Sequence, residues 1–214
     1  MNSIKKHGLD ITRAAFTSGS GIAKYLNAFG VSLYLSRNPE DVRGALNNSI
    51  AAGLLYATTT NYTDDIKEIR IAFDADAVIF SAESERVFKK HGLEAFIQHE
   101  IKNANRLLPE GPFANFLKTL TILQQQSNSD IKINLAIITA RCSPTHDRII
   151  KTLRAWNVRI DQMFFMGGIP KTSVIEEYKP HIFFDDQTIH CDTAAKVAPT
   201  AMVITDYSVS ENTQ

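Results

Sequence analysis

The chain has 214 residues, which suits one α/β domain with a small attachment. Apolar residues make up 44% and charged residues 21%, so there is ample apolar surface to bury and disorder is excluded as the main state. The 23 basic and 23 acidic side chains cancel, which leaves no electrostatic footprint for nucleic acid or an anionic membrane. No apolar run approaches the ~20 residues that span a bilayer.

The N-terminal stretch MNSIKKHGLDITRAAF lacks the apolar segment of a signal peptide. Two cysteines, Cys142 and Cys191, are too few for a disulfide framework. We therefore expect a cytoplasmic protein with reduced thiols, and neither nucleic acid nor membrane as a partner.

The first part of the chain resembles a later part of it. A shift of 149 positions pairs residues 4–56 with residues 153–205 without gaps, and the apolar pattern holds throughout. Phe16 falls on Phe165, Gly19 on Gly168, and the segment LYLS on IFFD. We therefore predict two parts: residues 1–65 as the remnant of a degenerate repeat unit, and residues 66–214 as the main domain. The alternative is an unrelated βαβαβ appendage.

Short apolar runs alternate with helix-length stretches in the main domain. The expected strands are residues 70–73, 133–138, 163–166, 181–184 and 201–204, and the expected helices are residues 144–156, 172–178 and 189–197. The runs are almost continuously apolar, which is typical of strands covered on both faces, so the alternation predicts a parallel sheet flanked by helices. Sites in such sheets lie just past the carboxyl ends of the strands.

An insertion follows the first of these strands. Residues 81–130 carry two helical apolar patterns, separated by the sequence PEGP at residues 109–112. Its size and place predict a helical cap over the site at about residues 81–130. The alternative is an extra pair of structural helices.

An acid pair ends the first strand of the main domain. In IAFDADAVIF, Asp74 and Asp76 are two residues apart and point the same way in an extended chain. Two carboxylates this close repel each other, and a divalent cation is the simplest source of compensating charge. The alternative is an Asp turn that caps the next helix.

Three further strand ends carry polar residues. HIFFDDQ ends in Asp185 and Asp186, which are oxygen ligands of the kind that Mg²⁺ prefers. LAIITAR ends in Thr139 and Arg141, and Lys171 lies between a strand and a helix in GGIPKTS. A hydroxyl, an ammonium and exposed backbone N–H groups are what a phosphoryl group needs.

In this order, the acid pair, Thr, Lys and second acid pair resemble the haloacid dehalogenase superfamily of phosphotransferases from residue 71 to residue 205. The segments IAFDADAVIFSAESERVFKKHGLEAFIQHE, TARCSP, KTLRAW and KPHIFFDDQTIH further resemble the type I cytosolic 5′-nucleotidases, which hydrolyse AMP and related nucleoside monophosphates. That family usually has Gly where this chain has Ala75. The resemblance implies a Rossmann-like parallel sheet flanked by helices, with a helical cap inserted after the first catalytic strand.

The resemblance also implies roles for individual residues. Asp74 would be the nucleophile that forms an aspartyl-phosphate, and Asp76 the general acid and then the general base. Thr139 and Lys171 would hold the phosphoryl oxygens. The implied cofactor is Mg²⁺, with ligands from the carboxylate of Asp74, the backbone carbonyl of Asp76, Asp185, and Asp186 through a bound water or by orienting Lys171. The implied substrate-binding side chains are Phe80, Ser84, His99, Glu100, Asn105 and Arg141.

The sequence thus predicts a Mg²⁺-dependent 5′-nucleotidase that converts nucleoside 5′-monophosphates to nucleoside and phosphate. The alternatives are a phosphatase of the same superfamily that acts on another small phosphate ester, and a nucleotide-binding module without turnover.

In the N-terminal repeat, Ile22, Ser36 and Arg37 stand at the positions of the catalytic Lys and second acid pair. A half-domain exposes a sheet edge, so we expect residues 1–60 either to mediate homo-oligomer formation or to dock onto the catalytic sheet.

Overall fold

A computed structural model describes residues 2–57, 67–126, 131–142 and 145–205. These residues form a seven-stranded sheet in the order β1-β2-β7-β6-β3-β4-β5. All the described strand pairs are parallel except β2 with β7, which is antiparallel. The strands are β1 (Leu33–Ser36), β2 (Ala51–Leu55), β3 (Glu68–Phe73), β4 (Lys132–Thr139), β5 (Gln162–Phe165), β6 (Ile182–Asp185) and β7 (Thr200–Met202).

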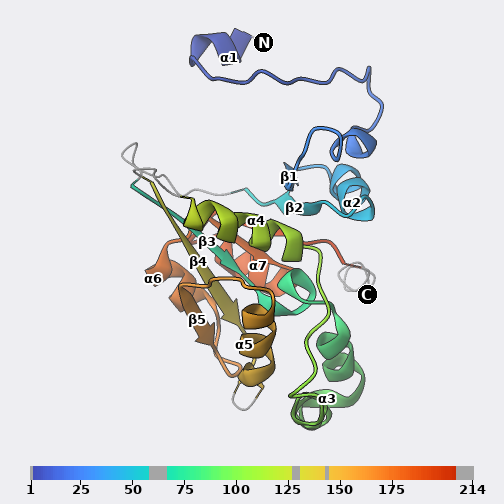
Figure 1. Ribbon diagram of the computed structural model, residues 1–214, viewed down its shortest axis with the longest axis vertical. Helices are drawn as coiled ribbons and strands as arrows, with labels where there is room; N and C mark the ends of the chain where they lie inside the picture. The colour runs from blue at the N-terminus through green and yellow to red at the C-terminus, as the bar shows by residue number, and fades with distance from the viewer. Residues whose placement is uncertain (1, 58–66, 127–130, 143–144, 206–214) are drawn as a thin grey trace.

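Helices cover both faces of the sheet (Figure 1). On one face, α4 (Ala114–Gln125) and α5 (His146–Ala155) pack against a core that includes Phe73 and Phe184. On the other face, α6 (Thr172–Tyr178) and α7 (Thr188–Ala194) pack against Ala72 and Phe183. Neighbouring residues of one strand thus enter opposite cores, which explains the continuously apolar runs. The predicted haloacid-dehalogenase-like α/β fold is confirmed.

The helix predicted for residues 144–156 corresponds to α5, and its predicted start lies outside the described residues. The predicted boundary between residues 65 and 66 also lies outside them. Across the described ranges, no helix is both long and apolar enough to cross a membrane.

The segment after β3 divides into two parts with different roles. Helix α3 (Glu83–Lys102) projects away from the sheet, whereas α4 lies along it (Figure 1). The side chains of Phe116, Leu117 and Leu120 place α4 in the main core. Of the cap predicted for residues 81–130, the portion in α4 is therefore a structural helix, held there by its apolar face.

Helix α3 is a helical hairpin rather than one straight helix. Gly92 at its centre has a φ of +79°, a left-handed value that favours glycine and interrupts the helix. The two halves contact each other: the Ser84 hydroxyl donates a 2.7 Å hydrogen bond to Glu100, and the Phe88 ring packs edge-on against Phe96. Residues 83–102 are called the cap hairpin below.

The N-terminal segment extends the sheet. It contains α1 (Asn2–Lys6), the 3₁₀ turn η1 (Ala23–Tyr25), β1, α2 (Pro39–Asn47) and β2, with α1 standing apart at the end of an extended stretch (Figure 1). Strand β2 pairs with β7 through Leu54 opposite Met202 and Leu55 opposite Ala201. We expected the N-terminal segment either to dock onto the catalytic sheet or to mediate homo-oligomer formation. In the structure it docks through β2, and a homo-oligomer stays a prediction.

The structure also gives elements that coincide under the shift of 149 positions. The turn η1, β1, α2 and β2 begin at residues 23, 33, 39 and 51, and α6, β6, α7 and β7 begin at residues 172, 182, 188 and 200. Ala45 in α2 and its counterpart Ala194 in α7 are both fully buried. These coincidences support the repeat, which stays a prediction.

Candidate active site

The carboxyl ends of β3, β4 and β6 meet at one edge of the sheet. Asp74 directly follows β3, Thr139 ends β4, Asp185 ends β6, and Lys171 is the residue before α6. Each of these side chains belongs to a residue that is at most 4% exposed. Parallel strands bring their carboxyl ends together, so residues that are far apart in the sequence share one site.

A cavity of about 300 Å³ opens at this edge, between the strand ends and the cap hairpin. It is lined from the sheet by Asp74, Asp76, Thr139, Arg141, Gly167 and Gln187, among others, and from the hairpin by Glu85, Phe88, Leu93 and Phe96.

A larger cavity of about 630 Å³ lies at the opposite ends of the strands, beside α6. Its polar side chains contact one another, with Arg70 3.1 Å from Glu68 and the Tyr178 hydroxyl 2.9 Å from Asn134. The grouped acids and the buried lysine identify the smaller cavity as the candidate site.

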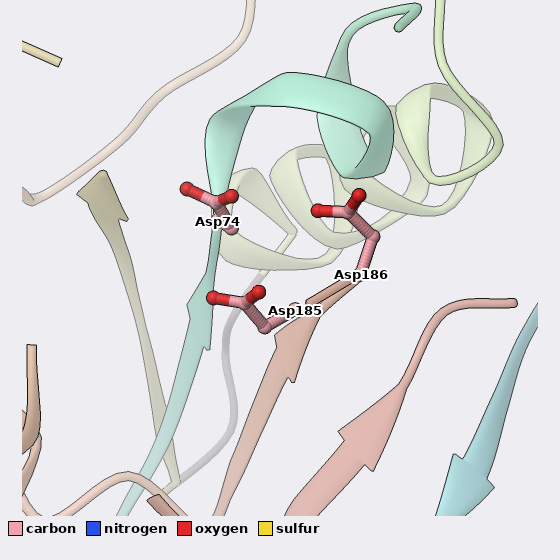
Figure 2. A group of neighbouring side chains, drawn as sticks. All are labelled: Asp74, Asp185 and Asp186. Atoms are coloured by element: carbon pink, nitrogen blue, oxygen red, sulfur yellow. The ribbon is translucent and has the colours of Figure 1, made fainter. Parts of the chain in front are cut away.

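Three carboxylates of the site form a compact cluster. One oxygen from each of Asp74, Asp185 and Asp186 lies within 4.8 Å of the others, and Figure 2 shows these groups facing a common point. The Lys171 ammonium lies 2.9 Å from Asp74 Oδ1 and 2.7 Å from Asp185 Oδ2. One ammonium cannot balance three buried carboxylates, so the cluster has excess negative charge.

The excess charge shows in the proton affinities. Burial, together with the charges of Asp74 and Asp185, raises the pKa of Asp186 to about 9. Burial raises the pKa of Asp74 to about 6, although Lys171 opposes the change. Burial alone would lower the pKa of Lys171, but Asp185 and Asp74 outweigh it and raise that pKa. A buried acid that retains its proton near neutral pH marks a place where positive charge is lacking.

The residues present fit a hard divalent cation. The cluster offers only carboxylate oxygens, which Mg²⁺ prefers. Apart from its ion pair with Lys171, Asp74 Oδ1 has no hydrogen-bond partner among the residues that the structure describes. Asp74, Asp185 and Asp186 come together as the predicted ligands. The Asp76 carboxylate turns toward Arg141 instead, which leaves only its backbone for the cation.

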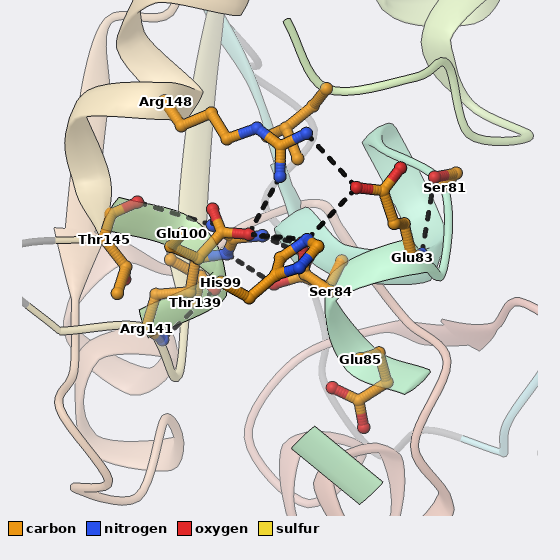
Figure 3. A network of polar contacts seen from close by, with 12 residues as sticks. Ser81, Glu83, Ser84, Glu85, His99, Glu100, Thr139, Arg141, Thr145 and Arg148 are labelled. Carbon is orange, nitrogen blue, oxygen red and sulfur yellow. Dashed lines mark hydrogen bonds and ion pairs between the residues drawn. The ribbon is translucent and has the colours of Figure 1, made fainter. Parts of the chain in front are cut away.

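Arg141 and Glu100 join the site to the cap hairpin (Figure 3). Arg141 Nε and Nη2 each donate a 2.6 Å hydrogen bond to Asp76, and Nη1 donates one of 2.5 Å to Glu100. Glu100 also accepts hydrogen bonds from Ser84 at 2.7 Å and from Arg148 at 3.0 Å. These side chains are buried, so their charges are stable only while they stay paired.

A family model described as 5′-nucleotidase matches residues 1–210. The chain belongs to the 5′-nucleotidase family. Over 207 residues it is 34% identical to human cytosolic 5′-nucleotidase 1B, a match that covers 94% of this chain and 34% of that protein. The chain thus spans about a third of the length of this curated relative. The 5′-nucleotidase family that the segments around Asp74 and Asp185 predicted is confirmed.

The side chains that the resemblance implied for substrate binding lie in different parts of this member of the 5′-nucleotidase family. Among them, Arg141 lines the cavity, and Ser84 and Glu100 lie behind it in the buried contacts to the hairpin. His99 contacts Glu83 at 3.2 Å, at the base of the hairpin (Figure 3).

Two of the implied side chains lie away from the cavity. Phe80 is fully buried and packs on Trp156, with ring centroids 5.4 Å apart. Asn105 lies on the surface and accepts a 2.9 Å hydrogen bond from Lys151. Neither side chain lines the cavity in this structure, and their part in substrate binding stays a prediction.

Sequence reasoning missed the apolar wall that the hairpin gives the cavity. Phe88, Leu93 and Phe96 line it, although their helical spacing had suggested ordinary packing positions. Gly92 was the available signal, because a chain reversal there places residues four positions before and after it side by side. Glu85 and the fully buried Arg148 were missed as well.

Proposed function

We propose that the chain is a Mg²⁺-dependent 5′-nucleotidase that hydrolyses AMP-like nucleoside 5′-monophosphates in the cytoplasm. The observation that carries the proposal is the buried cluster of Asp74, Asp185 and Asp186 with Lys171 between two of them. Membership of the 5′-nucleotidase family supports it, as does the printed name of the human relative.

In the proposed reaction, Asp74 attacks the phosphorus atom and its carboxylate oxygen forms a bond to it. The bond from phosphorus to the ribose oxygen breaks, and Asp76 gives a proton to that oxygen. In the second step Asp76 takes a proton from water, which attacks the aspartyl-phosphate and releases phosphate. A pKa of about 6 leaves Asp74 mostly ionised at neutral pH, as a nucleophile requires.

Thr139 and Lys171 hold the phosphoryl oxygens in this scheme, because both are buried at the strand ends beside Asp74. Asp74, Asp185 and Asp186 would hold Mg²⁺, which supplies positive charge that orients the phosphoryl group and neutralises its oxygens. Lys171 already contacts Asp74 and Asp185, so it fixes two of these three carboxylates.

The cap hairpin is the proposed source of substrate choice. Every phosphate ester presents the same group to Thr139 and Lys171, so discrimination must come from the rest of the cavity. Phe88, Leu93 and Phe96 give it an apolar aromatic wall. Stacking of a base on an aromatic side chain is worth ~1–3 kcal/mol, which favours nucleotides over sugar phosphates by at least about tenfold in kcat/KM.

A phosphate-release assay over nucleotides and sugar phosphates, with Mg²⁺ or with excess EDTA, tests the proposal. We expect Mg²⁺-dependent release that is fastest for a nucleoside 5′-monophosphate. Equal rates for AMP and glucose 6-phosphate would favour an unspecialised phosphatase. Nucleotide binding without turnover would favour the non-catalytic alternative, and full activity in EDTA would contradict the metal dependence.

We further propose that residues 1–65 are the remnant of a degenerate repeat unit and that residues 66–214 form the catalytic unit. The coinciding starts of four pairs of elements support the repeat. The helical cap in this proposal is the hairpin of residues 83–102, because α4 packs in the core.

A further inference from the structure

The side chain of Arg141 forms hydrogen bonds with two carboxylates. It donates two hydrogen bonds of 2.6 Å to Asp76 and one of 2.5 Å to Glu100. The residue is 4% exposed, and its guanidinium lies 5.2 Å from the centre of the Phe96 ring. A guanidinium held on both edges orients the carboxylates it contacts. These contacts suit Arg141 to orienting Asp76, and its place in the cavity lining leaves the predicted substrate contact open as well.

The orientation of Asp76 depends on this contact. The chain leaves β3 at Phe73 and turns, with Asp76 in extended backbone and Ala77 in the left-handed region at a φ of +59°. Regular secondary structure therefore does not fix the direction of the Asp76 side chain. Both of its carboxylate oxygens accept hydrogen bonds from Arg141, and these set the direction.

Glu100 brings the cap hairpin into the same arrangement. It lies in the second half of the hairpin, contacts Ser84 of the first half, and pairs with Arg141 and Arg148 of the body. It is 2% exposed. If the hairpin moved away from the body, Glu100 would leave Arg141, and buried charges would lose their partners. The seating of the hairpin and the orientation of Asp76 are therefore linked.

We propose that the Glu100–Arg141 bridge holds the Asp76 carboxylate in its working position only when the cap hairpin is seated. The inference rests on the proposed function and concerns its second step, in which the Asp76 carboxylate takes the proton of the attacking water. The bridge makes proton transfer dependent on a closed cavity, from which bulk water is excluded.

The test is Glu100→Gln in the full chain, with and without Asp76→Asn. Glutamine keeps the shape of the side chain and an oxygen for Ser84, but loses the charge that holds Arg141. The matched control is Glu94→Gln, the same change in the same half of the hairpin, at an exposed residue that contacts Gln98 at 3.1 Å. The assay is Mg²⁺-dependent release of phosphate from radiolabelled AMP, with kcat and KM determined separately.

We expect Glu100→Gln to lower kcat at least about tenfold while KM stays within about threefold, and Glu94→Gln to change neither by more than about twofold. In the Asp76→Asn background, Glu100→Gln should cause no further loss, because the group that it positions is gone. A merely structural role would lower the residual rate by the same factor in both backgrounds.

If Glu100→Gln does not fold, Ser84→Ala replaces it in the test. This variant removes one hydrogen bond to Glu100 and leaves every charge in place. It should lower kcat about two- to fivefold, again only when Asp76 is present. Equal fractional losses of kcat in both backgrounds, or a rise in KM with kcat unchanged, would overturn the proposed role of the bridge and leave the proposed function standing. A wild-type protein that is inactive on all phosphate esters would overturn the proposed function and the bridge with it.

Discussion

Without a divalent cation, the free energy of unfolding should fall as the pH rises from 7 to 8. Burial and the neighbouring carboxylates raise the pKa of Asp186 to about 9, so the folded protein keeps this proton in that range. In the unfolded chain an Asp is ionised above roughly pH 4. One proton held only by the folded state lowers the free energy of unfolding by about 1.4 kcal/mol per pH unit. Asp74, with a pKa of about 6, is already ionised and adds little.

A change of this size is measurable by thermal unfolding. For a chain of this length, 1 kcal/mol corresponds to roughly 2–4 °C, so Tm in EDTA should fall by about 3–6 °C between pH 7 and pH 8. Asp186→Asn should abolish most of the fall, because it removes the titrating group. The matched control is Asp192→Asn on the exposed side of α7, which should keep the fall. Calorimetry or circular dichroism at the two pH values makes the comparison.

Mg²⁺ should offset this dependence. The cation needs the ionised carboxylate, so its binding displaces the proton of Asp186 and its apparent affinity should rise up to about tenfold from pH 7 to pH 8. Mg²⁺ should therefore raise Tm more at pH 8. A Tm in EDTA that is independent of pH, a fall that persists in Asp186→Asn, or equal effects of Mg²⁺ at both pH values would each refute the reasoning.

Asp74→Asn should reduce phosphate release about a thousandfold or more, and near-normal turnover would exclude Asp74 as the nucleophile. Phe88→Ala should lower kcat/KM for AMP about tenfold and change little for p-nitrophenyl phosphate; equal losses for both esters would remove Phe88 from the base site. Phe80→Ala should cost about 3–5 kcal/mol of stability without a selective effect on AMP, since the side chain is fully buried. A Cβ on Gly53 would lie 2.8 Å from the Ala201 Cβ, so Gly53→Ala should destabilise the chain by about 1–3 kcal/mol, and an unchanged Tm would argue against the β2–β7 contact.

The catalytic edge of the sheet was predictable from the sequence because its determinants are local. A continuously apolar run followed at once by acids, as at Asp74 and Asp185, marks both a buried strand and its carboxyl end. Parallel pairing then brings those ends together without further information, and the structure has β3 between β4 and β6. The bounds of α6, residues 172–178, also agree with the prediction, since Lys171-Thr172 and Lys179-Pro180 limit the helix.

The cap was less predictable because tertiary contacts decide which surface each of its apolar side chains packs against. Helical spacing shows that Phe88, Phe96 and Phe116 are apolar positions but not which surface each one meets. Phe116 meets the sheet, whereas Phe88 and Phe96 meet each other across the hairpin and line the cavity. Phe80 enters the core because it forms a β-bridge with Glu110, thirty residues further along the chain. Such a pairing between distant residues leaves no local pattern in the sequence.

The geometry of the sheet explains why the proposed N-terminal repeat carries an apolar pattern without the chemistry. Strands β2 and β7 are counterparts under the shift, and they pair antiparallel, so the two units point in opposite directions across this contact. The carboxyl end of β1, with Ser36, therefore faces the edge of the sheet opposite to Asp185. Acids at that end would lie far from Asp74 and Lys171 and could not serve the same cavity. Leu54 and Leu55, by contrast, pair with β7 and pack against the hydrophobic cores on either side of this contact. Apolar residues are therefore needed in this unit whether or not it ever held a site.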